Sequence, residues 1–291
     1  MLAAQDVAAG LAEPRRVAVV DGVRLSYYLA GDGLPLVLLH GDGASALDWS
    51  WVVPTLSRRY QVYTLDLPGH GDSDKPAASY TPAYLEKIVV GFLDALDLAR
   101  VALFGSSIGG LIALRAALHR PGRLLALGLV DSGGLGKAIS PALTATLLPG
   151  VGELLIAWNK TPLGASQRAF SRALMMFARP DRAPSGWLQD QRRLAQTPGC
   201  LEAALAAARQ AADVFGQREV YREELSGLQL PTALVWGEQD RVVPARHARE
   251  SVARLRDGHL FLIPDCGHLP HVERPDQFVA AVDRLLSRIR V

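Results

Sequence analysis

Cysteine is scarce in this sequence, with Cys200 and Cys266 the only two among 291 residues. A disulfide framework needs more cysteines than this, and a chain of this length can bury a substantial core without covalent cross-links. The sequence therefore argues against the small, disulfide-stapled class of secreted protein, and we expect a fold that does not depend on oxidation.

A long apolar run is also missing, since no uninterrupted stretch reaches the roughly 18 to 20 residues that span a bilayer. The first residues, MLAAQDVAAGLAEPRR, are apolar, but they lack the basic start of a signal peptide and include Asp6. We therefore expect residues 1–16 to form a short N-terminal extension, and we predict no membrane span and a cytoplasmic location.

An excess of charge of one sign is lacking as well. The 31 Lys and Arg residues nearly balance the 29 Asp and Glu residues, and no dense Lys/Arg cluster occurs. Nucleic-acid-binding proteins usually carry a basic patch, so the sequence predicts no nucleic-acid partner. The 49% of hydrophobic residues is typical of a globular chain with a packed core.

What the chain does have is a series of short apolar segments that alternate with helical patterns. Asp21-Gly22 is suited to a tight turn between the first two expected strands. Thr81-Pro82 is a good start for a helix that reaches about Leu98. Strands are expected at 17–20, 23–30, 36–39, 61–66, 101–104 and 124–130, with a further helix at about 108–119. Continuous apolar strands that alternate with helices predict a mostly parallel sheet covered on both faces.

The alternation is interrupted between about residues 134 and 228. This stretch shows helical periodicity without strands, near 141–148, 151–158, 165–178, 185–196 and 201–214. The earlier pattern resumes with expected strands at 232–236 and 259–263 and helices at 245–255 and 276–290. We therefore predict an α/β core made of residues 17–133 and 229–291, with residues 134–228 inserted as an all-helical cap.

The segment Gly105-Ser106-Ser107-Ile108-Gly109 fits the pattern G-x-S-x-G, directly after one expected strand and directly before a helix. Such a sharp turn holds the central serine in a strained conformation with its hydroxyl exposed. The sequence thus predicts Ser107 as a nucleophile. Ser106 is the alternative, but the pattern places it at an x position.

Serine needs a base, and the base needs an orienting acid. His268 follows the last expected strand and is the best candidate base, with His271 as the alternative. A zinc site made of this pair and Glu273 is disfavoured, because a proline-containing loop has no helical register that would aim both rings at one ion.

Asp240 is the best candidate acid, because it follows an expected strand at the carboxyl end of the sheet, where active sites of open α/β folds gather. Asp131 also ends a strand and is the rival, and Glu238 is a weaker one. Two backbone N–H groups, those of Asp42 and Ile108, are the expected oxyanion hole.

These motifs together resemble the α/β-hydrolase superfamily over about residues 17–133 and 229–290. The matching segments are His40 to Gly43, Asp66 to Ser73, the serine turn, Gly237 to Asp240, and Gly267 to Pro275. The resemblance implies a catalytic triad in the order Ser107, Asp240, His268. Residues 130–136 resemble the start of the cap in esterases and carbon–carbon-bond hydrolases.

Two residues argue against particular branches of this superfamily. Leu269 stands where meta-cleavage-product hydrolases usually have Trp. Ser107 stands where epoxide hydrolases and haloalkane dehalogenases use Asp.

We therefore expect a serine hydrolase that cleaves a carboxylic ester of a small to medium apolar substrate, as a monomer or homodimer, without metal or cofactor. The expected substrate contacts are Gly41, Trp158, Met176, Trp187 and Leu269. The same triad could instead cleave a carbon–carbon bond, a lactone or an amide, or form peracids. An alternative of another class is a ligand receptor built on a hydrolase scaffold.

Overall fold

A computed structural model describes residues 14–289 of the chain. Most of the predicted extension, residues 1–13, lies outside the described residues, and the first strand already begins at Arg16. Eight strands form one sheet: β1 (Arg16–Val20), β2 (Val23–Ala30), β3 (Leu34–Leu39), β4 (Tyr60–Leu65), β5 (Val101–Ser106), β6 (Leu124–Val130), β9 (Thr232–Gly237) and β10 (Gly258–Ile263).

The strands of this sheet lie in the order β1-β2-β4-β3-β5-β6-β9-β10. β2 runs antiparallel to both of its neighbours, β1 and β4, and all other neighbours are parallel. Every residue of β5 and β9 is buried, which accounts for their continuous apolar sequences. The predicted mostly parallel α/β sheet is confirmed.

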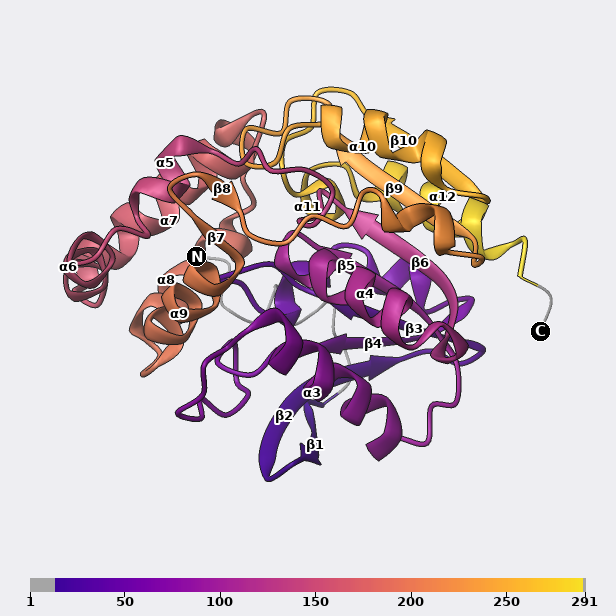
Figure 1. Cartoon of the computed structure of the whole chain (residues 1–291). Helices are drawn as coiled ribbons and strands as arrows, with labels where there is room; N and C mark the ends of the chain where they lie inside the picture. Colours follow the sequence, from indigo (N-terminus) through magenta and orange to yellow (C-terminus); the bar gives the residue numbers. More distant parts are fainter. Residues whose placement is uncertain (1–13, 290–291) are drawn as a thin grey trace.

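Helices cover both faces of the sheet (Figure 1). The helices outside the insertion are α2 (Val53–Leu56), α3 (Pro82–Ala95), α4 (Ile108–His119), α10 (Arg246–Ser251), α11 (Pro270–Glu273) and α12 (Pro275–Leu286). Short 3₁₀ helices form at Ala46–Trp49, Pro121–Arg123, Pro180–Arg182, Glu224–Gly227 and Val252–Arg254. Within residues 14–289, no helix combines the length and apolar character needed to cross a membrane.

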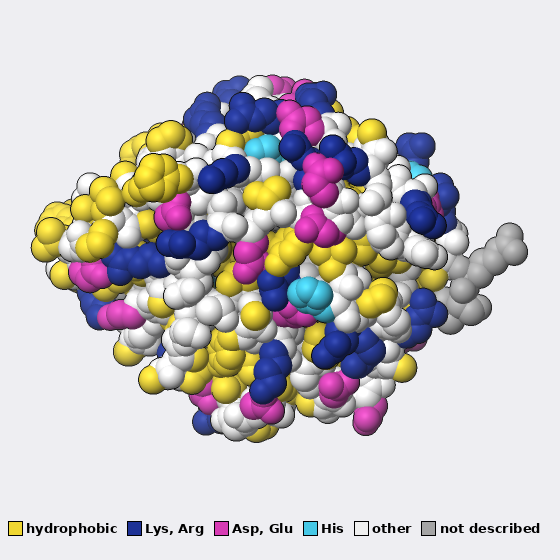
Figure 2. All heavy atoms as spheres, in the orientation of Figure 1, with side chains coloured by type: hydrophobic (Ala, Val, Ile, Leu, Met, Phe, Trp, Pro, Cys, Tyr) yellow, Lys and Arg dark blue, Asp and Glu magenta, His cyan; other side chains and the backbone are white. Residues whose placement is uncertain are grey.

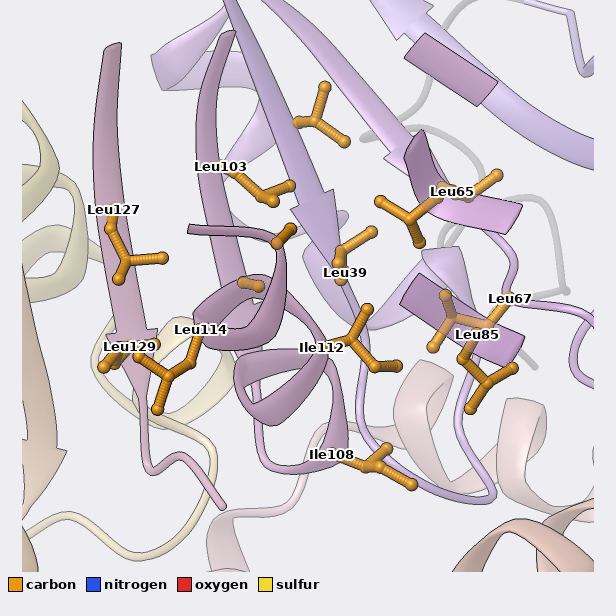
Figure 3. Packing of buried hydrophobic residues seen from close by; sticks show 14 of the residues in the cluster. Leu39, Leu65, Leu67, Leu85, Leu103, Ile108, Ile112, Leu114, Leu127 and Leu129 are labelled. Atoms are coloured by element: carbon orange, nitrogen blue, oxygen red, sulfur yellow. The ribbon is translucent and has the colours of Figure 1, made fainter. Parts of the chain in front are cut away.

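The two faces of the sheet bury separate hydrophobic clusters. One cluster includes α3 and α4, and Figure 3 shows Ile112 of α4 next to Leu39 of β3 and Leu114 of α4 next to Leu129 of β6. The other cluster packs α12 and the 3₁₀ helix Ala46–Trp49 against the opposite face, where the ring of Phe278 contacts those of Trp49 and Phe104. The site-bearing turn between β5 and α4 is therefore anchored in a packed core.

Helix α3 ends three residues earlier than predicted. Asp97 adopts a positive φ of 54°, and the N–H of Leu98 bonds to the carbonyl of Leu93. This 6→1 bond is the one that closes a helix through a left-handed residue. The sequence pattern did not include this stop, because glycine is the usual residue in that position.

Between β6 and β9 the chain forms the helices α5 (Pro141–Ala145), α6 (Val151–Asn159), α7 (Pro162–Met176), α8 (Ser185–Gln196) and α9 (Cys200–Ala211). The prediction that this stretch contains no strand is wrong. β7 (Ala212–Asp213) and β8 (Gly216–Gln217) form a small antiparallel ladder where a helix through residue 214 was expected. Gly216, with a φ of 114°, permits the turn.

Large apolar side chains are exposed mainly on this insertion. Of the exposed large hydrophobic residues described, all but Val17 and Val19 lie between residues 148 and 220. Leu154, Leu163 and Phe170 are examples, and Figure 2 shows hydrophobic side chains gathered at the end of the molecule that α6 and α7 form in Figure 1. Such a surface is typical of a region that contacts apolar material.

Candidate active site

Ser107 lies on the turn between β5 and α4, with a φ of 54° and a ψ of −117°. A residue other than glycine is rare and strained at positive φ, so the surrounding structure must hold it there. The turn has no space for larger neighbours: a Cβ on Gly105 would lie 2.1 Å from the carbonyl oxygen of Gly109, and one on Gly109 would lie 2.5 Å from that of His40. The tight turn presents the Ser107 side chain at the end of the sheet.

His268 and Asp240 form a buried hydrogen-bonded pair. The distance from Nδ1 of His268 to Oδ2 of Asp240 is 2.8 Å, and both side chains are almost fully shielded from solvent. The second oxygen of Asp240 accepts bonds from the backbone N–H groups of Val242, at 2.7 Å, and Val243, at 3.1 Å. With Nδ1 donating to Asp240, Nε2 of His268 is left as the proton acceptor. His268 and Ser107 line the same small cavity of about 30 Å³.

Asp131, the rival acid, lies in the same place. One oxygen each of Asp131 and Asp240 and one ring nitrogen of His268 lie within 4.8 Å of one another. Oδ1 of Asp131 accepts the N–H of Gly237 at 3.0 Å. Burial, followed by the charge of Asp240, raises the pKa of Asp131 well above its usual range. The structure thus brings both carboxyl groups together, but Asp240 is the one bonded to the imidazole. The weaker rival, Glu238, is exposed.

His271, the alternative base, is buried in the core instead of facing the serine. Its ring stacks on Trp49 with centroids 4.0 Å apart, and neither ring nitrogen has a hydrogen-bond partner. Burial lowers the pKa of His271 to about 3. Glu273 is occupied elsewhere, because its carboxylate accepts the N–H groups of Gly267, Ala178 and Arg179. The zinc set considered from the sequence is therefore not assembled.

The loop after β3 carries the predicted oxyanion donor Asp42. Two contacts hold this residue: Nε2 of His70 lies 3.3 Å from its Oδ1, and Arg172 donates to its backbone oxygen at 3.0 Å. Among residues 14–289, the backbone N–H groups of Asp42 and Ile108 donate to no protein acceptor. Ile108 is the first residue of α4, where free N–H groups and the helix dipole favour negative charge.

The predicted substrate contacts are distributed unevenly. Gly41, Met176 and Leu269 line the small cavity with Ser107 and His268. Trp158 lines a much larger cavity of about 620 Å³ between the insertion and the core. The interpretation of Trp187 as a substrate contact is not supported: it lines none of these cavities, and its buried ring packs edge-on against Phe177.

Three contributors near the site were not predicted from the sequence. Leu143 of α5 lines the large cavity, the small one and a third cavity of about 60 Å³ beside Ser107. Arg172 contacts the Asp42 loop, and Glu273 ties the loop that carries His268 to the end of α7. The spacing Arg168-x-x-x-Arg172, which places two cations on one face of a helix, was an available but unused signal.

The sheet order, the strained serine and the histidine–aspartate pair together define an α/β hydrolase. The chain belongs to the alpha/beta hydrolase family, whose model matches residues 36–281, and it is accordingly a hydrolase.

The chain also resembles individual members of the family. It is 33% identical over 262 residues to a dihydrolipoyllysine-residue acetyltransferase component of an acetoin cleaving system from Pseudomonas putida, covering 89% of this chain but only 66% of that protein. It is 29% identical over 279 residues to 2-hydroxymuconate semialdehyde hydrolase of a Pseudomonas species, covering 94% of this chain and 93% of the relative. A bacterial membrane phospholipase A has a similar structure, with a TM-score of 0.79, 27% identity, and coverage of 98% of this chain and 89% of that one.

Proposed function

We propose that this protein is a serine hydrolase that cleaves a carboxylic ester through an acyl-enzyme intermediate. The observation that carries the proposal is the buried hydrogen bond between His268 and Asp240 beside a strained Ser107. A serine hydroxyl reacts at neutral pH only when a held base removes its proton. The three residues supply this arrangement from three separate parts of the chain.

In the first half of the proposed reaction, Nε2 of His268 takes the hydroxyl proton while Oγ of Ser107 bonds to the ester carbonyl carbon. The carbonyl oxygen becomes an anion that accepts the N–H groups of Asp42 and Ile108. The bond from the carbonyl carbon to the alkoxy oxygen then breaks, and the leaving alcohol takes the proton from His268. Asp240 stabilises the imidazolium while it lasts.

In the second half, water replaces the alcohol. His268 takes a proton from the water molecule while the water oxygen attacks the carbonyl carbon of the acyl-enzyme. The N–H groups of Asp42 and Ile108 again stabilise the oxyanion. Collapse of this intermediate breaks the bond to Oγ, which recovers the proton from His268. Removing one oxyanion donor typically raises the activation free energy by roughly 3–4 kcal/mol, so these two N–H groups should contribute strongly to the rate.

We further propose that residues 134–228 act as a cap over this site. Met176 of α7 and Leu143 of α5 line the small cavity that contains Ser107 and His268. The cavities that reach Ser107 measure only about 30 and 60 Å³, which is too little for a drug-sized ligand. Substrate entry therefore requires side chains of the cap to move.

A second candidate is hydrolysis of a carbon–carbon bond. The similarity to 2-hydroxymuconate semialdehyde hydrolase over nearly the full length of both chains favours it. Leu269, at the position after the base, argues against it. The test is to incubate the protein with 2-hydroxymuconate semialdehyde and to measure its absorbance. Loss of the absorbance would indicate carbon–carbon-bond hydrolysis, and a constant absorbance would argue against it.

Two measurements test the ester proposal. The wild-type protein should hydrolyse p-nitrophenyl butyrate and react covalently with a fluorophosphonate probe, and Ser107→Ala should do neither. Ser106→Ala is the matched control and should keep the labelling. If the wild-type protein does not react with the probe and binds esters without hydrolysing them, it would instead be a ligand receptor.

A further inference from the structure

The large cavity beside the active site has an unusual combination of linings. Most of the residues around its 620 Å³ are apolar, including Leu147, Leu155 and Ile156. The charged residues in its wall are three arginines and one carboxylate: Arg168, Arg172, Arg241 and Asp42. A cavity for a purely apolar ligand has no need of this excess of guanidinium groups.

Two of these arginines, Arg168 and Arg172, lie on α7 and turn toward the loop after β3. Arg168 donates to the backbone oxygen of Gly43 at 3.0 Å and to the backbone and side-chain oxygens of Gln191. Arg172 donates to the backbone oxygen of Asp42, while its Nε is buried without a partner. Among residues 14–289, no carboxylate oxygen lies within 4.0 Å of a nitrogen of either side chain.

Burying a guanidinium without a counter-ion is costly, and three nearby acids, Asp190, Asp48 and Asp42, could serve as counter-ions. Asp190 is taken by Arg193, at 2.8 Å, and by the hydroxyl of Ser45. Burial, followed by the charge of Asp190, raises the pKa of Asp48 to about 7, so this group is only partly ionised at neutral pH. Asp42 contacts His70 and its charge also favours both arginines, but burial outweighs this effect and lowers the pKa of Arg172 and that of Arg168, the latter to about 9. The nearby acids therefore do not fully compensate the burial of Arg168 and Arg172.

Arg172 also lies close to the reacting centre. It lines both the large cavity and the small one that holds Ser107 and His268. A Cβ built on Gly41 would lie 3.2 Å from Cβ of Ser107, and one on Gly43 would lie 3.3 Å from Nη1 of Arg172. Residues two apart have Cα atoms at most about 7 Å from each other, so the guanidinium and the nucleophile contact the same short loop.

We propose that Arg172, supported by Arg168, binds a carboxylate of the substrate. The substrate class is then a half-ester of an apolar dicarboxylic acid, or a related acyl compound with a free carboxylate a few carbons from the bond that is cleaved. The carboxylate accepts from Nε and Nη2 of Arg172, whose N–H bonds point the same way along one edge of the guanidinium, while the other hydrogen of Nη2 stays on the backbone oxygen of Asp42. The carbon chain between the two carboxyl groups lies near Leu143, which lines the large cavity and both small ones. This inference rests on the proposed serine esterase function.

The test compares two esters of nearly equal length and leaving group: mono-p-nitrophenyl adipate, which has a free carboxylate, and p-nitrophenyl hexanoate, which has none. The wild-type protein should have the higher kcat/KM for the adipate. In Arg172→Gln the ratio of the two kcat/KM values should fall by about 10- to 100-fold, the loss typical of a charged hydrogen bond. Most of the change should be in KM, because the carboxylate is held equally before and during the reaction.

Two further variants make the result specific. Arg172→Lys keeps the charge but loses the two-pronged geometry, and its ratio should be intermediate. Arg179→Gln removes an exposed arginine that pairs with Asp181, and it should leave the ratio and both rates unchanged. A wild-type preference for the hexanoate, or an equal loss on both esters in Arg172→Gln, would overturn the carboxylate site. The second outcome would leave Arg172 with a role in holding the Asp42 loop only.

A binding measurement separates this inference from the esterase proposal. Calorimetric titration of Ser107→Ala with monomethyl adipate should give a Kd about 10-fold or more below that for methyl hexanoate, and Arg172→Gln added to this variant should abolish the difference. If the adipate ester binds more tightly but the wild type hydrolyses no ester, the esterase proposal is refuted and the carboxylate site stands. If the wild type hydrolyses esters but the two ligands bind equally, the carboxylate site is refuted and the esterase proposal stands.

Discussion

The carboxyl groups of Asp131 and Asp240 lie together beside His268, at the ends of the neighbouring strands β6 and β9. Asp131 has a positive φ of 43° and is fully buried. Two buried carboxylates in contact cannot both ionise without a large cost, and burial, followed by the charge of Asp240, raises the pKa of Asp131. Asp240 has two N–H donors and the imidazole to stabilise its charge, and Asp131 has a single N–H donor. We expect a proton on Asp131.

This arrangement predicts different results for the two asparagine variants. Asp240→Asn removes the charge that stabilises the imidazolium, and kcat for a p-nitrophenyl ester should fall about 10⁴-fold. Asp131→Asn keeps an N–H donor toward Asp240, and kcat should stay within about fivefold of the wild type. The opposite ranking would make Asp131 the acid that orients His268.

The pKa of Asp131 also predicts how stability depends on pH. Because this pKa is raised in the folded protein, the native state keeps a proton that the unfolded chain releases above a pH of about 4. The native state then binds more protons, so this group lowers the free energy of unfolding as pH rises toward its folded pKa, by up to about 1.4 kcal/mol per pH unit.

Asp131→Asn lacks this proton, so its stability relative to the wild type should increase from pH 4 to pH 7. Urea denaturation of both proteins across this range measures the difference. A difference that does not change with pH would show that Asp131 is ionised in the folded protein.

The two histidines that follow the last strand should also behave differently. His268→Ala should lower kcat by at least about 10³-fold, because the proton acceptor is gone. His271→Ala should leave kcat nearly unchanged but remove the ring that stacks on Trp49, and it should lower the free energy of unfolding by about 2–4 kcal/mol. Initial rates and chemical denaturation of both variants separate the two roles, and loss of activity in folded His271→Ala would reassign the base.

Leu143 should control which acyl chains the site accepts, because it lines the two small cavities that reach Ser107 and also the large cavity beside them. Leu143→Ala should join the small cavities to the large one and raise the ratio of kcat/KM for p-nitrophenyl octanoate over acetate by about fivefold or more. Leu163→Ala, a truncation of an exposed leucine on α7, is the matched control and should leave the ratio unchanged. An unchanged ratio in Leu143→Ala as well would mean that another residue divides the cavities.

The parts of the fold that follow from local pattern were predictable from the sequence. The apolar run at 124–130 and the helix at 108–119 are confirmed to the residue, because burial on both sides of a strand and a turn before a helix leave clear signals. The ladder of β7 and β8 was not predictable, because each strand has only two residues and too few side chains to form a pattern.

The candidate site was predictable where a short motif names the residue, as for Ser107. The interpretation of Trp187 as a substrate contact is not supported, since a helical aromatic residue packs into a core as readily as it lines a cavity. The contact of Arg172 with Asp42 joins residues 130 positions apart and depends on how α7 crosses the core, which no local pattern reveals. The catalytic roles, the location and the oligomeric state stay predictions.

The insertion leaves the sheet after β6 and returns to it as the adjacent strand β9, with Leu127 paired to Thr232 and Val130 to Val235. For the sheet, residues 131–231 therefore amount to one long loop whose two ends already meet. The entropy needed to close such a loop grows only with the logarithm of its length, by about 0.6 kcal/mol for each doubling. Large changes in the insertion thus cost the core little, so evolution can alter what such an enzyme recognises while the chemistry beneath it is preserved.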